Sequence, residues 1–132
     1  MEITISQLLT AATGRLLCPM EDVYRIYNFL TRDNLFTHQL PRAGREVEPW
    51  LFRWFPWLAA VDTRPLDALL AGGGDPQAAC DAWVRSIIDV NHLLETVHIE
   101  PIPQDDHDRI DPIDEAVAMV GKDKVIVVRA EN

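Results

Sequence analysis

A chain of 132 residues with 48% hydrophobic content can build one domain around one core and is too short for two independent domains. No stretch approaches the roughly 20 continuous apolar residues of a membrane helix, and the N-terminus has no basic region ahead of an apolar segment, so we expect a cytosolic protein. The net charge of −9 lies wholly in the second half: residues 1–66 hold seven acids and seven bases, and residues 67–132 hold fourteen acids and five bases. An acidic surface repels phosphates, which disfavours nucleic-acid binding through that half.

A short strand and two helices are the first elements we predict in chain order. Ile3-Thr4-Ile5 is β-prone, and Ser6 is a suitable N-cap residue for a short helix that ends at Gly14. Pro19 suits the first position of the next helix, whose apolar residues recur at helical spacing as far as Leu30.

Proline and glycine divide the middle of the chain. Pro41 and Gly44 interrupt the helical pattern, Pro56 prevents one uninterrupted helix through the aromatic segment, and Gly72-Gly73-Gly74 ends the helix before it. The expected elements are a short helix over residues 34–40, a loop over 41–47, a helix to about Phe55 and a short helix over 64–70.

The clearest helix signal follows the glycine run. Asp75 suits the N-cap and Pro76 the first helical position, which predicts a helix over residues 75–94. Its predicted buried face is an apolar stripe of Cys80, Trp83, Ile87, Val90 and Leu94.

The last part of the chain has the pattern of strand, helix and strand. Residues 96–102 alternate apolar with polar side chains as an edge strand does, Asp111-Pro112 starts a helix that ends at Gly121, and residues 124–129 are β-branched. A strand–helix–strand unit favours a parallel crossover, although antiparallel pairing stays open.

These elements predict an α+β fold that is mostly helical, with a small sheet formed by N-terminal and C-terminal strands and covered by helices. We expect a single domain over residues 1–132. Its helical part spans about residues 6–94, and its acidic strand–helix–strand part spans about residues 95–132.

The acidic segment is the first candidate for a binding surface. Between Glu95 and Glu115 the chain holds eight acids and one base, Arg109, a local charge of −7. A carboxylate cluster can hold a hard cation, but this one lacks the glycine and the spacing of an EF-hand loop, so we predict a solvated surface without metal. The candidate partner-binding residues are Asp105, Asp106, Asp108, Asp111, Asp114 and Glu115.

A second candidate surface mixes cations with planar rings. Such a mixture stacks on nucleic-acid bases or anchors a protein interface, although packing in the core is the commoner role of aromatic side chains. Its residues are His38, Arg42, Arg45, Trp50, Arg53, Trp54 and Trp57.

Signals of catalysis are missing from the sequence. No serine or cysteine stands in a recognised nucleophile motif, and no phosphate-binding loop is present. Cys18 and Cys80 are far apart and lack the spacing of a zinc or redox motif. We therefore predict no cofactor, no metal and no enzymatic activity.

A resemblance to a known family rests on Thr13-Gly14-Arg15-Leu16-Leu17 and above all on residues 33–43, which read Asp-Asn-Leu-Phe-Thr-His-Gln-Leu-Pro-Arg-Ala. Asp111-Pro112 followed by Gly121 is also similar. The chain resembles a domain of unassigned function found in small proteins of bacteriophages, mainly those of actinobacteria, and in prophage regions of their hosts. The resemblance brings no activity with it.

The resemblance implies a phage accessory protein in the cytoplasm of a bacterial host cell. Inhibition of host defence is one recurrent job of such proteins, and an acidic surface can occupy the basic nucleic-acid channel of a defence complex such as a CRISPR effector. We therefore expect protein–protein binding, with no membrane partner. The alternative is a regulatory protein that contacts nucleic acid through the Arg/Trp segment 42–57, and an enzyme that uses His38 or the loop 105–111 stays open.

Overall fold

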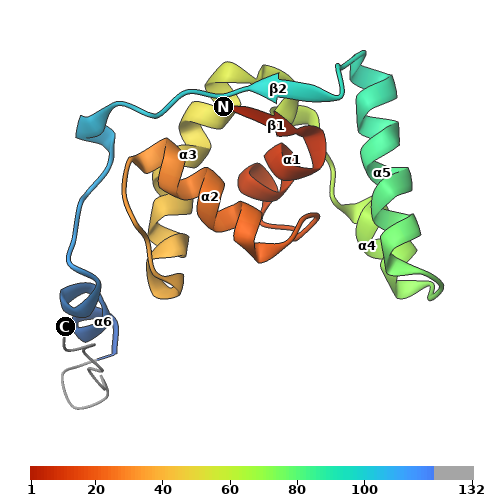
Figure 1. Cartoon of the computed structure of the whole chain (residues 1–132). Coiled ribbons are helices and arrows are strands. Elements are labelled where there is room, and N and C mark those ends of the chain that lie inside the picture. Colours follow the sequence, from red (N-terminus) through yellow and green to blue (C-terminus); the bar gives the residue numbers. More distant parts are fainter. Residues whose placement is uncertain (121–132) are drawn as a thin grey trace.

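The computed structural model describes residues 1–120, which form a set of helices with a two-stranded sheet along one edge (Figure 1). The expected α+β class, mostly helical with a small sheet, is confirmed. In chain order the elements are β1 (Glu2–Thr4), α1 (Ile5–Thr13), α2 (Met20–Thr31), the 3-10 turn η1 (Thr37–Gln39), α3 (Leu40–Trp54), the 3-10 turn η2 (Pro56–Ala60), α4 (Arg64–Ala71), α5 (Pro76–Asn91), β2 (Thr96–His98), the 3-10 turn η3 (Gln104–Asp106) and α6 (Pro112–Val120).

The sheet joins the N-terminus to the segment that follows α5. β1 and β2 pair antiparallel, with Ile3 opposite Val97. The pairing is extended by Met1, whose amino group donates to the carbonyl of Ile99 at 3.0 Å and whose carbonyl accepts from the amide of Ile99 at 2.9 Å. The predicted strand 96–102 is thus shorter than expected, and its possible partner 124–129 lies outside the described residues.

Thr4, and not the predicted Ser6, caps α1. Its hydroxyl accepts from the amide of Gln7 at 3.2 Å, while the side chain of Gln7 accepts from the amide of Thr4 at 2.8 Å, so the two form a capping box. The N-cap lies two residues earlier than predicted, because β1 ends at Thr4 and Ile5 is already helical. The predicted end of α1 is confirmed, since Gly14 adopts a left-handed conformation with φ of +76°.

The loop predicted over residues 41–47 is wrong, because α3 runs through it. Pro41 falls in the first turn of α3, where no intrahelical partner is needed for a backbone N–H. Gly44 faces Tyr27 of α2, and a Cβ at this position would lie 3.3 Å from the Tyr27 hydroxyl oxygen. The glycine therefore allows close packing of α2 and α3 and does not end a helix. The predicted end of the aromatic helix near Phe55 is confirmed.

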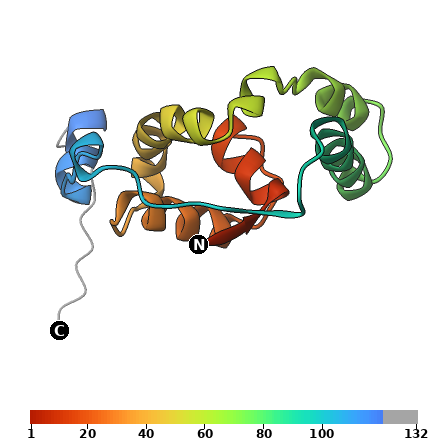
Figure 2. The same cartoon turned by 90° about the horizontal axis from the view of Figure 1, so that it is seen from above.

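The core lies among α1, α2, α3 and the sheet (Figure 2). Tyr27 ties two of these helices together, because its buried hydroxyl donates to the carbonyl of Ala11 at 3.0 Å. The side chains that are at most 1% exposed in the three helices are Ile5, Leu8, Leu9, Ile26, Leu30, Ala43, Val47 and Leu51. Among residues 1–120, no helix is long and apolar enough to cross a membrane.

Helices α4 and α5 form a hairpin at one end of the molecule (Figures 1 and 2). The predicted cap of α5 is confirmed, since the carboxylate of Asp75 accepts from the amide of Gln77. The predicted buried stripe is right only in its middle: Trp83 is 3% exposed, whereas Val90 is 77% and Leu94 is 80% exposed. Val84 and Ile88, 8% and 6% exposed, are buried beside Trp83 instead, so the buried face is turned from the predicted one, and α5 ends at Asn91, before Leu94.

Helix α6 lies at the opposite end and begins as predicted (Figure 1). The carboxylate of Asp111 accepts from the amide of Ile113 at 2.9 Å, which makes Asp111 the cap. The predicted apolar face is only partly covered, because Val120 is 51% exposed. The buried side chain of this helix is a carboxylate, Glu115, which is 8% exposed.

The capping box makes a stability prediction with an internal control. We expect Thr4→Ala to lower the free energy of unfolding by about 1 kcal/mol, because one amide of the first turn loses its acceptor. Ser6→Ala, which changes the residue that the sequence favoured as cap, should change it by less than about 0.5 kcal/mol. Urea denaturation of both variants measures the difference, and a larger loss for Ser6→Ala would contradict the observed cap.

Candidate functional site

The acidic segment packs against η1 and α3, and we call the line of hydrogen bonds and ion pairs between them the seam. We call residues 103–115 the acidic arm. It leaves the sheet after Ile102, whose amide donates to the carbonyl of Leu30 at 2.9 Å, and then runs along the end of the helical body to α6 (Figures 1 and 2). The hydrogen bonds and ion pairs that join the arm to η1 and α3 connect residues more than 50 positions apart in the chain.

A bidentate ion pair between Arg42 of α3 and Glu115 of α6 holds the arm against α3. The guanidinium donates from Nε to one carboxylate oxygen at 2.7 Å and from Nη2 to the other at 2.8 Å. These side chains are only 15% and 10% exposed. The hydrogen bonds from Arg42, helped by Gln39, keep the pKa of Glu115 below its ordinary value although burial opposes this shift.

Residues of η1 bind the backbone of the arm. Gln39, which is 1% exposed, donates to the carbonyl of Ile110 and to the carboxylate of Glu115, both at 2.9 Å. The Nε2 atom of His38 lies 2.6 Å from the carbonyl oxygen of Pro112. The predicted surface residue His38 therefore contacts the chain itself, and Gln39 adds a fixed, fully bonded amide beneath the arm.

A buried histidine fastens the middle of the arm. The side chain of His107 is 3% exposed and lies between two carboxylates: Nε2 is 2.7 Å from Asp33 and Nδ1 is 2.8 Å from Glu46. A neutral imidazole has a single N–H, so His107 can donate to both carboxylates only in its charged form. Burial alone would raise the pKa of Asp33, but hydrogen bonds from His107 and from the amide of Asn34 hold it below its ordinary value.

Glu46 connects the histidine to the ion pair. Its carboxylate accepts from Nη1 of Arg42 at 3.2 Å and from the amide of Asp108 at 2.7 Å, in addition to His107. Arg42 also donates to the carbonyl of Asp108 at 2.6 Å and has a raised pKa, chiefly because of its hydrogen bonds to Glu115. The buried charges thus form one connected network between α3 and the arm.

Among the tryptophans of the predicted Arg/Trp segment 42–57, Trp50 forms a hydrogen bond to the arm. The indole Nε1 of Trp50 donates to the carboxylate of Asp106 at 2.8 Å, and the Arg53 guanidinium lies 4.5 Å from the centre of the Trp50 ring. Trp54 packs against Trp50, with ring centres 5.9 Å apart. Glu46 joins these residues around a pocket of about 320 Å³, which is lined by Glu46, Pro49, Trp50, Arg53 and Asp106.

The two surfaces predicted as alternatives therefore meet. His38, Arg42 and Trp50 bind the arm, whereas Arg45 and Arg53 are exposed, and Trp57 packs against Phe55. Sequence reasoning missed Asp33, Gln39 and Glu46, because nothing in their local sequence indicates a partner in the arm. Of the six predicted acids, Glu115 is buried, and the exposed ones are Asp105, Asp106, Asp108, Asp111 and Asp114.

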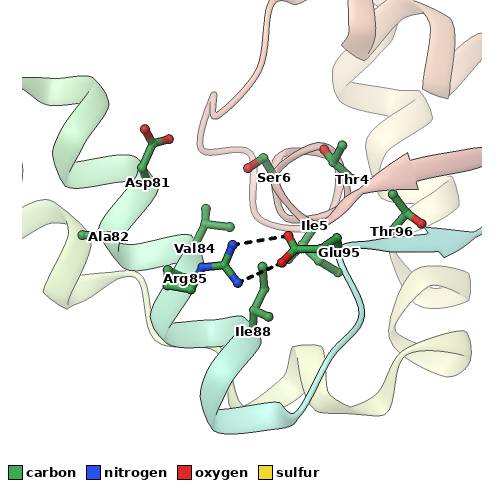
Figure 3. A pocket seen from close by; sticks show the side chains of 10 residues that line it. All are labelled: Thr4, Ile5, Ser6, Asp81, Ala82, Val84, Arg85, Ile88, Glu95 and Thr96. Carbon is green, nitrogen blue, oxygen red and sulfur yellow. Dashed lines mark hydrogen bonds and ion pairs between the residues drawn. The ribbon is translucent and has the colours of Figure 1, made fainter.

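A second, larger pocket of about 610 Å³ lies between the start of α1, α5 and β2 (Figure 3). Its floor is apolar, with buried Ile5, Val84 and Ile88. The ion pair of Arg85 with Glu95, 2.9 Å long, spans it, but both side chains are more than half exposed, so the pair adds little stability. None of the predicted partner-binding residues of either surface lines this pocket.

Metal binding and catalysis receive no support from the described side chains. Within residues 1–120, no group of three or more His, Cys, Asp or Glu side chains is arranged to hold a metal ion. Cys18 and Cys80 are both half-buried free thiols that line one pocket of about 350 Å³. Burial raises the pKa of Cys18, which makes its thiol a weaker nucleophile at neutral pH.

Comparison with protein families gives a match to part of the chain. Residues 4–61 match a domain family described as a domain of unknown function, DUF7736. The matched part extends from the end of β1 through η2, so it holds the α3 side of the seam and leaves out the acidic arm. Nothing in this description indicates a catalytic activity. Neither the curated proteins nor the solved structures yielded a match.

Loss of the Arg42 guanidinium should destabilise the domain strongly. Arg42→Met leaves the carboxylates of Glu115 and Glu46 buried beside an apolar side chain, which costs about 3 kcal/mol of unfolding free energy. Arg45→Met removes the same charge from an exposed site on the same helix and should cost less than about 0.5 kcal/mol. Urea denaturation compares the two, and equal losses would show that the ion pair does not hold the arm.

The depressed pKa of Glu115 predicts the direction of a pH effect. Its carboxylate contributes stability above the ordinary pKa of 4.5, and this contribution is lost as the pH falls through the lower native value. Between about pH 6 and pH 3 the wild type should therefore lose more unfolding free energy than Glu115→Gln, which has no such carboxylate. Urea midpoints across this range test the prediction, and parallel pH profiles would contradict it.

Proposed function

We propose that this chain acts by binding a basic surface of another protein through the exposed carboxylates of the acidic arm. The observation that carries the proposal is the division of the arm's acids into two sets. Glu115 faces inward and is paired with Arg42, whereas Asp105, Asp108 and Asp114 are exposed, and none of these three side chains accepts a hydrogen bond from another of the residues 1–120.

A fixed acidic surface suits a basic partner. Because the backbone of the arm is bound at Ile110, Pro112 and Asp108, the partner does not have to order a loose segment on binding. Carboxylates held in this way steer a basic partner toward the surface and raise the association rate at low salt.

The proposed setting follows from the family resemblance in residues 33–43. It is a phage-type accessory protein in the cytoplasm of a bacterial host cell, and the basic surface is the nucleic-acid channel of a host defence complex. The acidic arm then acts as a mimic of nucleic acid, as an anti-CRISPR protein of this kind would. Carboxylates in place of phosphates supply the charge that such a channel binds.

The alternative, nucleic-acid binding through the Arg/Trp segment 42–57, has less support from the geometry. Arg42 is committed to Glu115 and Glu46, and the indole N–H of Trp50 is committed to Asp106. Of the remaining cations of the segment, Arg53 lines a pocket with Glu46 and Asp106, whose carboxylates repel phosphates, and Arg45 is exposed.

Charge reversal on the arm tests the proposal. The variant Asp105→Lys, Asp108→Lys and Asp114→Lys should lose most capture of a protein partner from nuclease-treated host lysate at low salt, and its residual capture should depend less on salt. The control variant Glu21→Lys, Asp81→Lys and Asp89→Lys changes the net charge equally on exposed sites away from the arm and should retain capture. Equal capture by both variants, or recovery of nucleic acid alone from untreated lysate, would refute protein binding through the arm.

A further inference from the structure

We infer that the pocket beside Trp50 is a binding site for one cationic side chain, arginine or lysine, of the basic partner. The inference deepens the proposed function and rests on it, because it names the chemistry that the partner would present at this point. The pocket, of about 320 Å³, lies between α3 and the arm and is open to solvent at the exposed carboxylate of Asp106.

The walls of the pocket combine the two features that bind organic cations. One wall is the indole of Trp50, whose face attracts a guanidinium or ammonium group. The other lining residues are Glu46, Pro49, Arg53 and Asp106, and the exposed carboxylate among them is that of Asp106, because the Glu46 carboxylate already binds Arg42, His107 and the amide of Asp108. One oxygen of Asp106 accepts from Trp50, so the second oxygen stays available to a donor from outside.

Arg53 shows that the Trp50 ring already receives a guanidinium. Its Cζ atom lies 4.5 Å from the ring centre, and the side chain belongs to the exposed surface of α3. Within residues 1–120 it forms no ion pair with a carboxylate, unlike Arg42 on the same helix. Arg53 thus covers the face of the Trp50 ring but is not held there by a carboxylate. A cation from a partner can therefore compete with Arg53 for the ring and displace it.

The neighbouring charges favour a cation delivered by a macromolecule over a free small molecule. Asp105 and Asp108 flank Asp106 in the chain and are exposed, so a partner that inserts one side chain beside Trp50 brings its other cations toward these carboxylates. Arg53 also lines the pocket, but an anionic ligand would be repelled by Glu46 and Asp106 and by the exposed carboxylates of Asp105 and Asp108.

Substitution of Arg53 gives a sharp test, because it removes the competitor without touching the arm. The probe is a synthetic hexa-arginine peptide at low salt, with hexa-glutamine as the uncharged control, and the measurement is the Kd by calorimetry. Arg53→Gln should tighten hexa-arginine binding two- to fivefold, the equivalent of about 0.5–1 kcal/mol for an exposed cation–π contact. Arg45→Gln removes the same charge from the exposed surface of α3 and should tighten it less.

The indole N–H signal of Trp50 in a ¹H–¹⁵N spectrum, assigned with Trp50→Phe, should shift on addition of hexa-arginine and not of hexa-glutamine. Equal Kd values for Arg53→Gln and Arg45→Gln, or a Trp50 signal that does not shift, would refute the proposal that the pocket binds a cationic side chain. If the triple lysine variant of the arm still loses binding in that case, the proposed function stands and only the pocket is wrong. Weaker binding of single-stranded DNA by Arg53→Gln, with no hexa-arginine binding by the wild type, would overturn both.

Discussion

The buried ion pair between Arg42 and Glu115 is the interaction on which the position of the acidic arm depends. A charge removed from water is costly unless it is paired and its remaining donors and acceptors are bonded, and both conditions are met here. Arg42 donates hydrogen bonds to Glu115, to Glu46 and to the carbonyl of Asp108, and Gln39 donates a further hydrogen bond to the carboxylate of Glu115. Geometry this specific permits one docking of the arm on α3.

This docking decides which of the acidic charges remain available. The residues from Glu95 to Glu115 carry a net charge of −7, but the carboxylate of Glu115 is buried and paired with Arg42. The exposed acids of the arm, Asp105, Asp106, Asp108, Asp111 and Asp114, lie on a surface that the network holds in place, and the pocket beside Trp50 borders Asp106. Glu95 and Glu100 lie outside the arm. The same network that stabilises the domain thus presents the surface that we propose binds a basic partner.

Features with local causes could be predicted from the sequence, and features with distant causes could not. Asp75 and Gly14 were predictable because a cap and a left-handed C-terminus depend on a few neighbouring residues. Gly44 was misread as a loop residue because its role, contact with Tyr27, depends on another helix. The inward position of Glu115 is set by a partner 73 residues earlier in the chain, so periodicity alone could not reveal it. For the same reason two surfaces that the sequence offers as alternatives form one seam.

A double-mutant cycle on Arg42 and Glu115 tests most directly whether this pair holds the arm. The unfolding free energies of the wild type, Arg42→Met, Glu115→Gln and the double variant give the coupling energy of the two side chains. The structure predicts a coupling of about 1–3 kcal/mol, because each single change strands the other charge in a buried site. Additive losses within about 0.5 kcal/mol would contradict the account, since they would mean that the two side chains do not interact in solution.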